Sequence, residues 1–426
     1  MRAAITTLGC KLNQYEGEQV REELERHGYE IVPFAAQADL YVVNSCTVTG
    51  KSDRDARRLA RQAKHRNPDA VVVVTGCYAE VSPEALRAIP EVDLVLGNSR
   101  KLDLAGVLHG EADREQAVEQ GCSGPLVQRF ADHTRAFVKV QEGCDAACTY
   151  CLVPRARGRS RSVPAVHVAE QVGRFVAAGH PEVVLIGTHL GRYGADRPQD
   201  DLDLAGLVRW LLEVPGLQRL RLSSIEPREV SSDLLDLVIH DRRVCRHLHI
   251  PLQSGSDTVL ARMCRPYDSG FHAELVGRIH NLDPRVAIGA DVMVGFPGET
   301  ADEYEETHAL LEALPLSYLH VFSYSARPGT AAAAMSEQVR PDLRKERSRR
   351  LTELSQRKRA AFADGLVGER VEVVVEGEVE PESGRLLGLT DNYVRALVPG
   401  DDTVVGRVVT VRLVAASPQG MLAELV

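Results

Sequence analysis

The stretch GCDAACTYC, residues 143–151, places three cysteines within eight positions. Cys144, Cys148 and Cys151 follow the spacing C-x3-C-x2-C, and the aromatic Tyr150 stands directly before the last of them. Three thiolates this close in sequence can hold three irons of a cubane 4Fe-4S cluster, whose irons favour soft thiolate ligands. The fourth iron has no cysteine nearby, so it is free to bind another molecule. The run therefore predicts a cluster that takes part in chemistry.

Two other kinds of site use grouped cysteines, a structural zinc ion and a disulfide framework. Zinc usually takes four protein ligands, often a close pair of cysteines with a distant second pair, and this chain has no second close pair. Disulfide frameworks are typical of short secreted domains. The N-terminus, MRAAITTLGC, lacks the apolar segment of a secretion signal. The iron–sulfur interpretation is therefore favoured.

The length and composition are those of a globular protein of roughly two or three domains. The longest apolar run, VVVV at residues 71–74, is far shorter than the ~18–20 residues of a membrane span. A net charge of −9 argues against a surface that binds nucleic acid all over. With nine cysteines and no export signal, we expect a cytoplasmic protein with no membrane contact.

The first hundred residues alternate strand and helix patterns. Strands are predicted at residues 3–8, 39–44 and 70–75, and helices at residues 17–26, 52–64, 83–88 and 103–108. Such alternation indicates a parallel sheet with helices on its faces. We therefore expect an α/β domain over residues 1–112. The polar stretch that follows contains Gly-Cys-Ser-Gly-Pro and is predicted to be a linker over residues 113–133.

The alternation resumes at Thr134 and continues through six strand–helix units. Strands are predicted at residues 136–141, 182–187, 217–222, 247–251, 285–292 and 318–324. This pattern predicts a full or partial TIM-type barrel over residues 134–364, with its ligand site at the carboxyl ends of the strands. A long basic helix over residues 340–362 completes it. Five short strands separated by turns then predict a small antiparallel β-barrel over residues 365–426.

A second set of cysteines shares one sequence context. Cys10, Cys46 and Cys77 each follow a predicted strand, in the runs ITTLGC, YVVNSC and VVVTGC. A single buried cysteine usually behaves as a small apolar side chain. Three in succession, at strand ends that meet at one edge of a parallel sheet, indicate a shared site. The other cysteines, Cys122, Cys245 and Cys264, show no such grouping.

Positive charge is concentrated in a few segments. Residues 340–359 hold nine Lys and Arg against three Asp and Glu, and residues 51–66 hold seven against two. Either segment can be an ordinary solvated helix face. Arg155, Arg157, Arg159 and Arg161 occupy alternate positions just after the cysteine run. We expect these four arginines to contact a phosphate backbone brought to the cluster.

Two sets of three cysteines ahead of a small β-barrel resemble the radical S-adenosylmethionine (SAM) methylthiotransferases. The run C-x3-C-x-aromatic-C is similar to the signature of radical SAM enzymes. The likeness covers essentially the whole chain, because the N-terminal region resembles the methylthiotransferase domain, the centre the radical SAM barrel and residues 365–426 the TRAM domain. Five further motifs agree in order: GTHLGRYG (187–194), LSSIEP (222–227), HLHIPLQSGSD (247–257), DVMVGFPGET (291–300) and FSYSARPGT (322–330).

The run TLGCKLNQYE, residues 7–16, resembles one branch of that family, which acts on N6-threonylcarbamoyladenosine beside the tRNA anticodon. The branch acting on isopentenyladenosine tends to have an aromatic before the first Gly-Cys and an Asp-Ser after the Asn. The branch acting on a ribosomal protein has Lys-Asn followed by Asp-Ser-Glu. Gln14, Tyr15 and Glu16 fit the first branch, and so does GRSRS at residues 158–162.

The resemblance implies a reaction that replaces the hydrogen on adenine C2 with a methylthio group. That C–H bond is unactivated, so a cofactor must perform the hard step. Cys144, Cys148 and Cys151 would hold the 4Fe-4S cluster that cleaves SAM. Cys10, Cys46 and Cys77 would hold an auxiliary 4Fe-4S cluster that carries the sulfur. One SAM supplies a radical and another supplies the methyl group.

The same resemblance implies where SAM binds. It would lie across the strand ends, against an apolar wall formed by residues 294–296. The candidates for its polar contacts are the backbone at Tyr150 and the residues Thr188, His189, Ser224, Glu226, Gln253 and Ser254.

The expected partners are the tRNA anticodon loop and a reducing electron donor such as a flavodoxin or ferredoxin. Loop bases are unpaired or easily splayed, so an enzyme reaches a base edge without opening a duplex. From residue 364 onward there are eleven Asp and Glu against five Lys and Arg, a poor balance for phosphate binding. We therefore expect the four arginines and the basic helix at residues 340–359 to contribute more of the tRNA contact than the C-terminal barrel.

Three alternatives remain. The nearest is a sister methylthiotransferase acting on N6-isopentenyladenosine or on a ribosomal protein. An iron–sulfur electron carrier is a second alternative, although carriers usually ligate each cubane with four cysteines. A tRNA-binding module without chemistry is the third, and it would need neither cysteine set.

Overall fold

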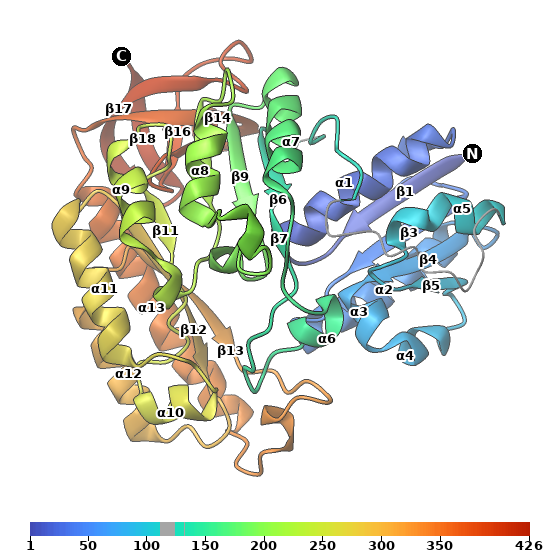
Figure 1. The fold of residues 1–426 in the computed structure, drawn as a ribbon, viewed down its shortest axis with the longest axis horizontal. Coiled ribbons are helices and arrows are strands. Elements are labelled where there is room, and N and C mark those ends of the chain that lie inside the picture. The colour runs from blue at the N-terminus through green and yellow to red at the C-terminus, as the bar shows by residue number, and fades with distance from the viewer. Residues whose placement is uncertain (111–123, 132) are drawn as a thin grey trace.

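The computed structural model describes residues 1–110, 124–131 and 133–426, which form three units (Figure 1). Residues 1–110 form a parallel five-stranded sheet in the order β2-β1-β3-β4-β5, with helices on its faces, as the sequence predicts. Its elements are β1 (Arg2–Thr7), α1 (Lys11–Arg26), β2 (Glu30–Val32), β3 (Leu40–Ser45), α2 (Gly50–Arg66), β4 (Val71–Gly76), α3 (Cys77–Val81), α4 (Pro83–Arg87), β5 (Leu94–Leu96) and α5 (Leu104–His109).

Apolar side chains bury this sheet on both faces. Helix α2 presents an alanine stripe, Ala56, Ala60 and Ala63, to one face, where it packs with the same core as Tyr41 and Val43. Val20 and Leu24 of α1 pack on the opposite face. A stripe at this helical spacing lets a helix lie flat on a sheet. Because β1, β3 and β4 are neighbouring parallel strands, their carboxyl ends lie side by side at one edge of the sheet.

Helix α1 starts at Lys11, well before the predicted start at residue 17. Gly17 lies inside the helix and does not mark its beginning. A Cβ at this position would come within 2.5 Å of Thr7 Oγ1, so the glycine lets α1 pack directly against β1. The first turn of α1 therefore follows immediately after Cys10.

Six parallel strands of the central unit form a partial TIM-type barrel, which confirms the predicted fold class. They belong to two sheets, β6-β9-β10 and β11-β12-β13, which the bridges Leu220–Val244 and Ser224–His249 join. Among the described residues β6 and β13 do not pair, and α1 lies beside β6 on that open side (Figure 1). The strands are β6 (Arg135–Lys139), β9 (Glu182–Ile186), β10 (Arg219–Leu222), β11 (His247–His249), β12 (Ala287–Val294) and β13 (Tyr318–Ser323).

Helices cover the outside of these strands. A single core contains apolar residues of the strands and helices together. The helices are α6 (Val153–Arg157), α7 (Ala165–Ala177), α8 (Leu204–Leu212), α9 (Ser232–His240), α10 (Asp257–Arg262), α11 (Ser269–Leu282), α12 (Ala301–Ala313) and α13 (Pro341–Asp364), and a short hairpin pairs β7 (Gln141–Glu142) with β8 (Arg161–Ser162). None of the helices in the described part of the chain is long and apolar enough to cross a membrane.

Much of the predicted linker, together with Cys122, lies outside the described residues. The described residues at the end of the linker pack against the central unit. Val127 and Phe130 are buried in the core of the central unit. The Gln171 side chain bonds both the backbone N–H and the carbonyl of Val127, each at 2.8 Å. This portion therefore belongs structurally to the central unit.

The C-terminal unit is a closed five-stranded barrel, as predicted, with one parallel strand pair among the antiparallel ones. Its strands are β14 (Arg370–Val379), β15 (Leu386–Thr390), β16 (Arg395–Val398), β17 (Val408–Ser417) and β18 (Gly420–Leu425).

This small barrel covers the amino-terminal ends of the central strands. Arg221 donates to the Asp391 carbonyl at 2.9 Å, and the Tyr393 ring stacks on His247 with centroids 4.3 Å apart. The cysteine run follows β6 and β7 at the carboxyl ends of the strands. The C-terminal barrel and the cysteine run therefore lie at opposite ends of the central barrel.

Candidate active site

Three cysteines of the N-terminal unit gather at the carboxyl edge of its sheet. Cys10, Cys46 and Cys77 follow the ends of β1, β3 and β4. Gly9 brings two of these loops into contact, because a Cβ there would lie 2.5 Å from the Cβ of Cys46. Burial raises the pKa of Cys46 to about 11, with smaller contributions from the nearby Cys10 and Cys77 sulfurs. These three free thiols, of which Cys46 is buried and Cys10 is exposed, are a donor set that fits a cluster whose irons would stabilise the thiolates.

The central cysteines lie in a loop tied to its own continuation. Gly143 adopts φ +77°, and a Cβ there would overlap the Arg159 carbonyl at 1.9 Å, so only glycine fits. The backbone N–H groups of Ala146 and Val153 donate to the sulfurs of Cys144 and Cys151, each at 3.4 Å. Donors aimed at sulfur stabilise thiolates and tune iron–sulfur clusters. This set also fits a 4Fe-4S cluster.

Arg265 contacts the cysteine run, and no sequence pattern identified this residue. Its Nη1 lies 3.1 Å from Cys148 Sγ, and its other nitrogens bond the Tyr267 hydroxyl and the Glu226 carboxylate. Burial raises the pKa of Cys148, while the Arg265 charge opposes this shift. Glu226, predicted as a SAM contact, is therefore paired with the arginine that contacts Cys148.

Thr188 and His189 lie beside the first cysteine of the run. Thr188 donates to Gln141 Oε1 at 3.2 Å. The two His189 ring nitrogens lie 3.3 Å from Cys144 Sγ and 2.8 Å from a Glu229 carboxylate oxygen. Although burial lowers it, the hydrogen bonds with Cys144 and Glu229 raise the pKa of His189 to about 10. His189 is thus held as a donor toward the sulfur.

The remaining predicted SAM contacts differ in accessibility. Ser224 is exposed just past β10, and Gln253 lies after β11, in an isolated bridge with Val292, with a backbone φ of +69°. Ser254 is 1 % exposed, and its hydroxyl lies 3.1 Å from that of Thr307 on α12. The prediction for Ser254 is therefore corrected, because its hydroxyl holds the loop against α12.

Tyr150 packs beside the predicted apolar wall. Its ring meets that of Phe296 edge to face, with centroids 6.5 Å apart, and both Val294 and Phe296 are buried. The chain at Tyr150 is thus fixed between the cysteine run and the wall.

A buried ion cluster of Glu16, Lys101, Lys139, Glu142 and Arg157 joins the N-terminal and central units. Arg157 Nη1 lies 2.8 Å from Glu16 Oε1 and 2.9 Å from Glu142 Oε1. Lys101 approaches Glu16 at 2.5 Å, and Lys139 approaches Glu142 at 3.1 Å. Although burial opposes it, the charges of Arg157 and Lys101 hold the pKa of Glu16 well below its usual range. Glu16 is six residues after Cys10 and Arg157 six after Cys151, so the ion cluster links the two cysteine sets.

The position of Arg157 corrects its predicted role. Its side chain is 2 % exposed and fully engaged, and its Nη2 also bonds Asn13 Oδ1 at 2.6 Å. A guanidinium enclosed in this way does not reach a phosphate backbone. Arg155, Arg159 and Arg161 are exposed. Arg155 and Arg161 line a cavity of about 230 Å³ between the N-terminal and central units, beside the buried ion cluster.

A second contact between these units lies beside Cys46. Arg327, in the loop after β13, pairs with Asp53 and donates to Thr47 Oγ1 at 2.7 Å. The Gly50 N–H donates to Ser325 Oγ at 3.2 Å. Each cysteine set is therefore close to a polar link between the two units.

Most of the basic side chains on α13 have partners within the protein. Arg347 pairs with Glu299, Arg350 with Glu305, and Lys358 donates to the Leu314 carbonyl at 2.7 Å. These bonds hold α13 along α12. The helix consequently offers fewer free cations to tRNA than its sequence suggests.

Several of these residues carry a weak signal in the sequence. Glu16 and Arg157 lie in the runs NQYE and RARGRS, but two oppositely charged residues 141 positions apart give no indication that they pair. Lys139 and Glu142 lie at the end of a strand, where a buried charge is unexpected without its partner. Arg265 follows helix α10 in the run MCRPY, which matches no chemical pattern.

Three families match successive parts of the chain. Residues 2–97 match uncharacterized protein family UPF0004, residues 138–311 the radical SAM superfamily and residues 365–426 the TRAM domain. Among solved structures, the radical SAM methyltransferase TsrM from Kitasatospora setae aligns with a TM-score of 0.58 at 15 % identity, over 78 % of this chain and 77 % of that one. With the cysteine run at the strand ends of the barrel, these matches define a radical SAM enzyme.

Similarity to curated proteins extends over nearly the full length. The threonylcarbamoyladenosine tRNA methylthiotransferase of Bacillus subtilis is 39 % identical over 97 % of this chain and 94 % of its own. The protein of the same name from Aquifex aeolicus is also 39 % identical, over 92 % and 96 %. A tRNA-2-methylthio-N6-dimethylallyladenosine synthase from Moorella thermoacetica is 34 % identical, over 99 % and 98 %. The chain belongs to the radical SAM methylthiotransferase family.

Proposed function

We propose that this enzyme converts N6-threonylcarbamoyladenosine beside the tRNA anticodon to its 2-methylthio derivative. The observation that carries the proposal is the pair of cysteine sets, held relative to each other by the buried ion cluster and the Arg327 contact. One set alone suffices to cleave SAM, whereas inserting sulfur requires a second site at a fixed position. The choice of nucleoside is supported by the higher identity to the threonylcarbamoyladenosine enzymes.

Cys144, Cys148 and Cys151 would hold a 4Fe-4S cluster that passes on the electron for SAM cleavage, and Cys10, Cys46 and Cys77 would hold a second cluster that carries the sulfur. The protein's own part is positioning and electrostatics. Arg265 and His189 place positive donors against the sulfurs of Cys148 and Cys144, which favours the thiolate form. A cytoplasmic flavodoxin or ferredoxin is the proposed electron donor.

The substrate is tested with anticodon stem–loop RNAs that carry either threonylcarbamoyladenosine or isopentenyladenosine. We expect a mass increase for methylthiolation of the first RNA only, measured by mass spectrometry of its nucleosides. Cys144→Ala serves as the inactive control. Conversion of the isopentenyl RNA alone would assign the enzyme to the sister branch.

For tRNA binding, we propose that Arg155, Arg159 and Arg161 contact the backbone near the cysteine sets. Charge reversal of all three is expected to weaken stem–loop binding and to reduce the salt dependence by about 0.7–0.9 in log–log slope for each lost phosphate contact. Arg242→Glu with Arg278→Glu, two exposed arginines outside the segments expected to contact tRNA, is the matched control. Binding measured by fluorescence anisotropy across a salt series separates the outcomes. An unchanged slope in the triple variant would contradict the assignment.

Deleting residues 365–426 would not be a clean test of whether the C-terminal barrel contacts tRNA. The C-terminal barrel covers Arg221 and His247 of the central barrel, so its removal would expose buried polar groups. Arg370→Glu with Arg412→Glu on its surface tests whether it contacts tRNA, because both side chains are exposed. We expect a smaller loss of affinity from this pair than from the triple variant.

A further inference from the structure

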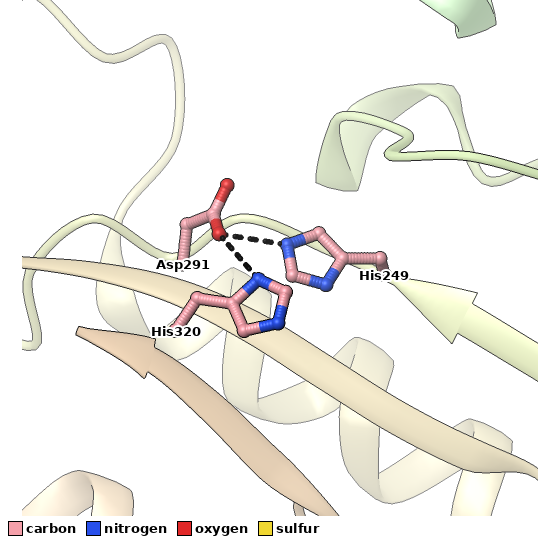
Figure 2. A group of neighbouring side chains, drawn as sticks. All are labelled: His249, Asp291 and His320. Atoms are coloured by element: carbon pink, nitrogen blue, oxygen red, sulfur yellow. Dashed lines mark ion pairs between the residues drawn. The ribbon is translucent and has the colours of Figure 1, made fainter. Parts of the chain in front are cut away.

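Three side chains of metal-binding type meet inside the central barrel, outside the two cysteine sets. His249, Asp291 and His320 come from the neighbouring strands β11, β12 and β13 and point toward one another (Figure 2). One Asp291 carboxylate oxygen lies 2.9 Å from His249 Nε2 and 3.4 Å from His320 Nδ1. One ligand atom from each residue lies within 4.8 Å of those of the other two. The three side chains therefore surround a common point.

The pairing of the strands brings these residues together. His320 lies directly opposite Asp291 in the pairing of β12 with β13. His249 lies opposite Gly289, two residues before Asp291, in the pairing of β11 with β12. Successive residues of a strand face opposite sides of the sheet. Leu319 packs in the core that the outer helices cover, so its neighbour His320 faces the barrel interior.

Tyr318 holds the His249 ring from its other side. The Tyr318 hydroxyl lies 3.1 Å from His249 Nδ1 and 2.7 Å from His247 Nε2. Gly289 makes room for the tyrosine ring, because a Cβ at this position would lie 2.1 Å from Tyr318 Cζ. A histidine that binds a metal through one ring nitrogen almost always has the other nitrogen hydrogen-bonded to an outer partner. His249 has this arrangement, with Nδ1 engaged and Nε2 beside Asp291.

The measured separations fit one coordination sphere. Zinc binds imidazole nitrogen and carboxylate oxygen at about 2.0–2.2 Å. Two such ligands lie about 2.9 Å apart when they form a right angle at the metal, and about 3.4 Å apart at the tetrahedral angle. The 2.9 Å and 3.4 Å separations from Asp291 are in this range. A small rotation of the half-exposed His320 ring is enough to bring the third separation into it.

An ion can reach this group from the barrel interior. The side chains of His320 and Asp291 are 45 % and 23 % exposed, whereas that of His249 is 7 % exposed. Two imidazoles and one carboxylate are a ligand set typical of zinc and of non-haem iron(II). Three protein ligands leave coordination positions free, and the exposed side chains place these positions on the accessible side.

We propose that His249, Asp291 and His320 bind one divalent transition-metal ion of the zinc or iron(II) type, in addition to the two clusters. Binding displaces any proton that the ligand atoms carry, so the site does not depend on the protonation state of the metal-free group. The ion ties the edge strand β13 to β12 and β11, on the side where β13 and β6 do not pair among the described residues. Water fills the free positions, which can accept a further oxygen ligand.

Zinc binding tests the site on enzyme with both clusters reconstituted under anaerobic conditions. Equilibrium dialysis against micromolar zinc, followed by elemental analysis, should give one zinc per chain in addition to about eight irons. Zinc K-edge X-ray absorption should show nitrogen and oxygen ligands at about 2.0–2.2 Å and no sulfur at about 2.3 Å. This spectrum separates the proposed site from zinc that has entered a cysteine set.

His320→Phe and Asp291→Asn each remove one ligand. The zinc affinity of either variant should fall at least about 100-fold, because loss of an outer partner alone typically costs about 10–100-fold. The iron content of both variants should stay at about eight per chain, which shows that the protein is folded and its clusters are intact. His240→Phe replaces an exposed histidine on α9 and is the matched control, which should bind zinc as the wild type does.

The outcomes that would overturn the proposal are specific. Wild-type enzyme that takes up no zinc would show that the three side chains form only a hydrogen-bonded group. Zinc held by sulfur, or zinc bound with undiminished affinity in both variants, would also overturn it. The proposal goes beyond the proposed function and does not depend on which nucleoside is modified. The assay with the two stem–loop RNAs therefore decides the proposed function separately.

Discussion

Alanine at Cys10, Cys46 and Cys77 is expected to reduce methylthiolated RNA to background while 5′-deoxyadenosine release continues. The reason is the separation of the two sets, because the triple change leaves Cys144, Cys148, Cys151 and the Arg265 contact intact. Alanine at the three central cysteines should instead abolish both products. Both are measured on anaerobically reconstituted protein under reductant, by mass spectrometry and liquid chromatography. The iron content should fall from about eight to about four per chain in either variant.

The control for this experiment is Cys245→Ala. Cys245 is a buried free cysteine that lies near the amino-terminal ends of the central strands, beside Glu182 and Arg219. It should keep both activities and its full iron content. Undiminished deoxyadenosine release after loss of the central set would contradict the assignment of SAM cleavage to those cysteines.

Arg157→Met is expected to lower the free energy of unfolding by about 3–5 kcal/mol, since it leaves buried carboxylates without their main partner. Glu16 and Glu142 both lose a guanidinium contact. A looser junction should also raise the ratio of deoxyadenosine to methylthiolated product, because the cysteine sets no longer keep their relative position. Arg159→Met is the control, because that side chain is 92 % exposed and its loss should change stability by less than about 0.5 kcal/mol.

The pH dependence of this destabilisation has a definite sign. The buried ion cluster lowers the pKa of Glu16 and of Glu142 in the folded protein. A lowered carboxyl pKa contributes stability that is present above the unfolded pKa and is lost as the pH falls toward the folded pKa. The difference between wild type and Arg157→Met should therefore be largest at neutral pH and shrink below about pH 4.5. A difference that grows with acidity would contradict this account.

Local patterns were sufficient to predict the architecture. Alternating strands and helices indicated the parallel sheet and the partial barrel because apolar periodicity reports burial directly. The helix start at Lys11 was missed because Gly17 resembles a helix boundary, whereas it is needed for contact with Thr7. Gly17 is required by a tertiary contact, and a local sequence pattern does not encode such a contact.

The sequence predicted the site residues only where the reactive side chains lie close together along the chain. The cysteines of residues 144–151 are close in sequence, whereas Glu16, Lys101 and Arg157 meet only after two units dock. The alternate arginines looked equivalent, yet one points inward because α6 packs against the N-terminal unit. Likewise His249, Asp291 and His320 are far apart in the sequence, and the neighbouring strands of the barrel bring them together.

The arrangement at the far end of the central barrel has a consequence for synthesis. Arg221 and His247 are enclosed only when Asp391 and Tyr393 are in place, near the end of the chain. The base of the central barrel is therefore completed only after residues 391–393 have been synthesised. A chain cut short before residue 390 would contain every cysteine, but the charged side chains at the amino-terminal end of its central barrel would be uncovered. We expect cellular proteases to degrade such a chain faster than the full-length protein.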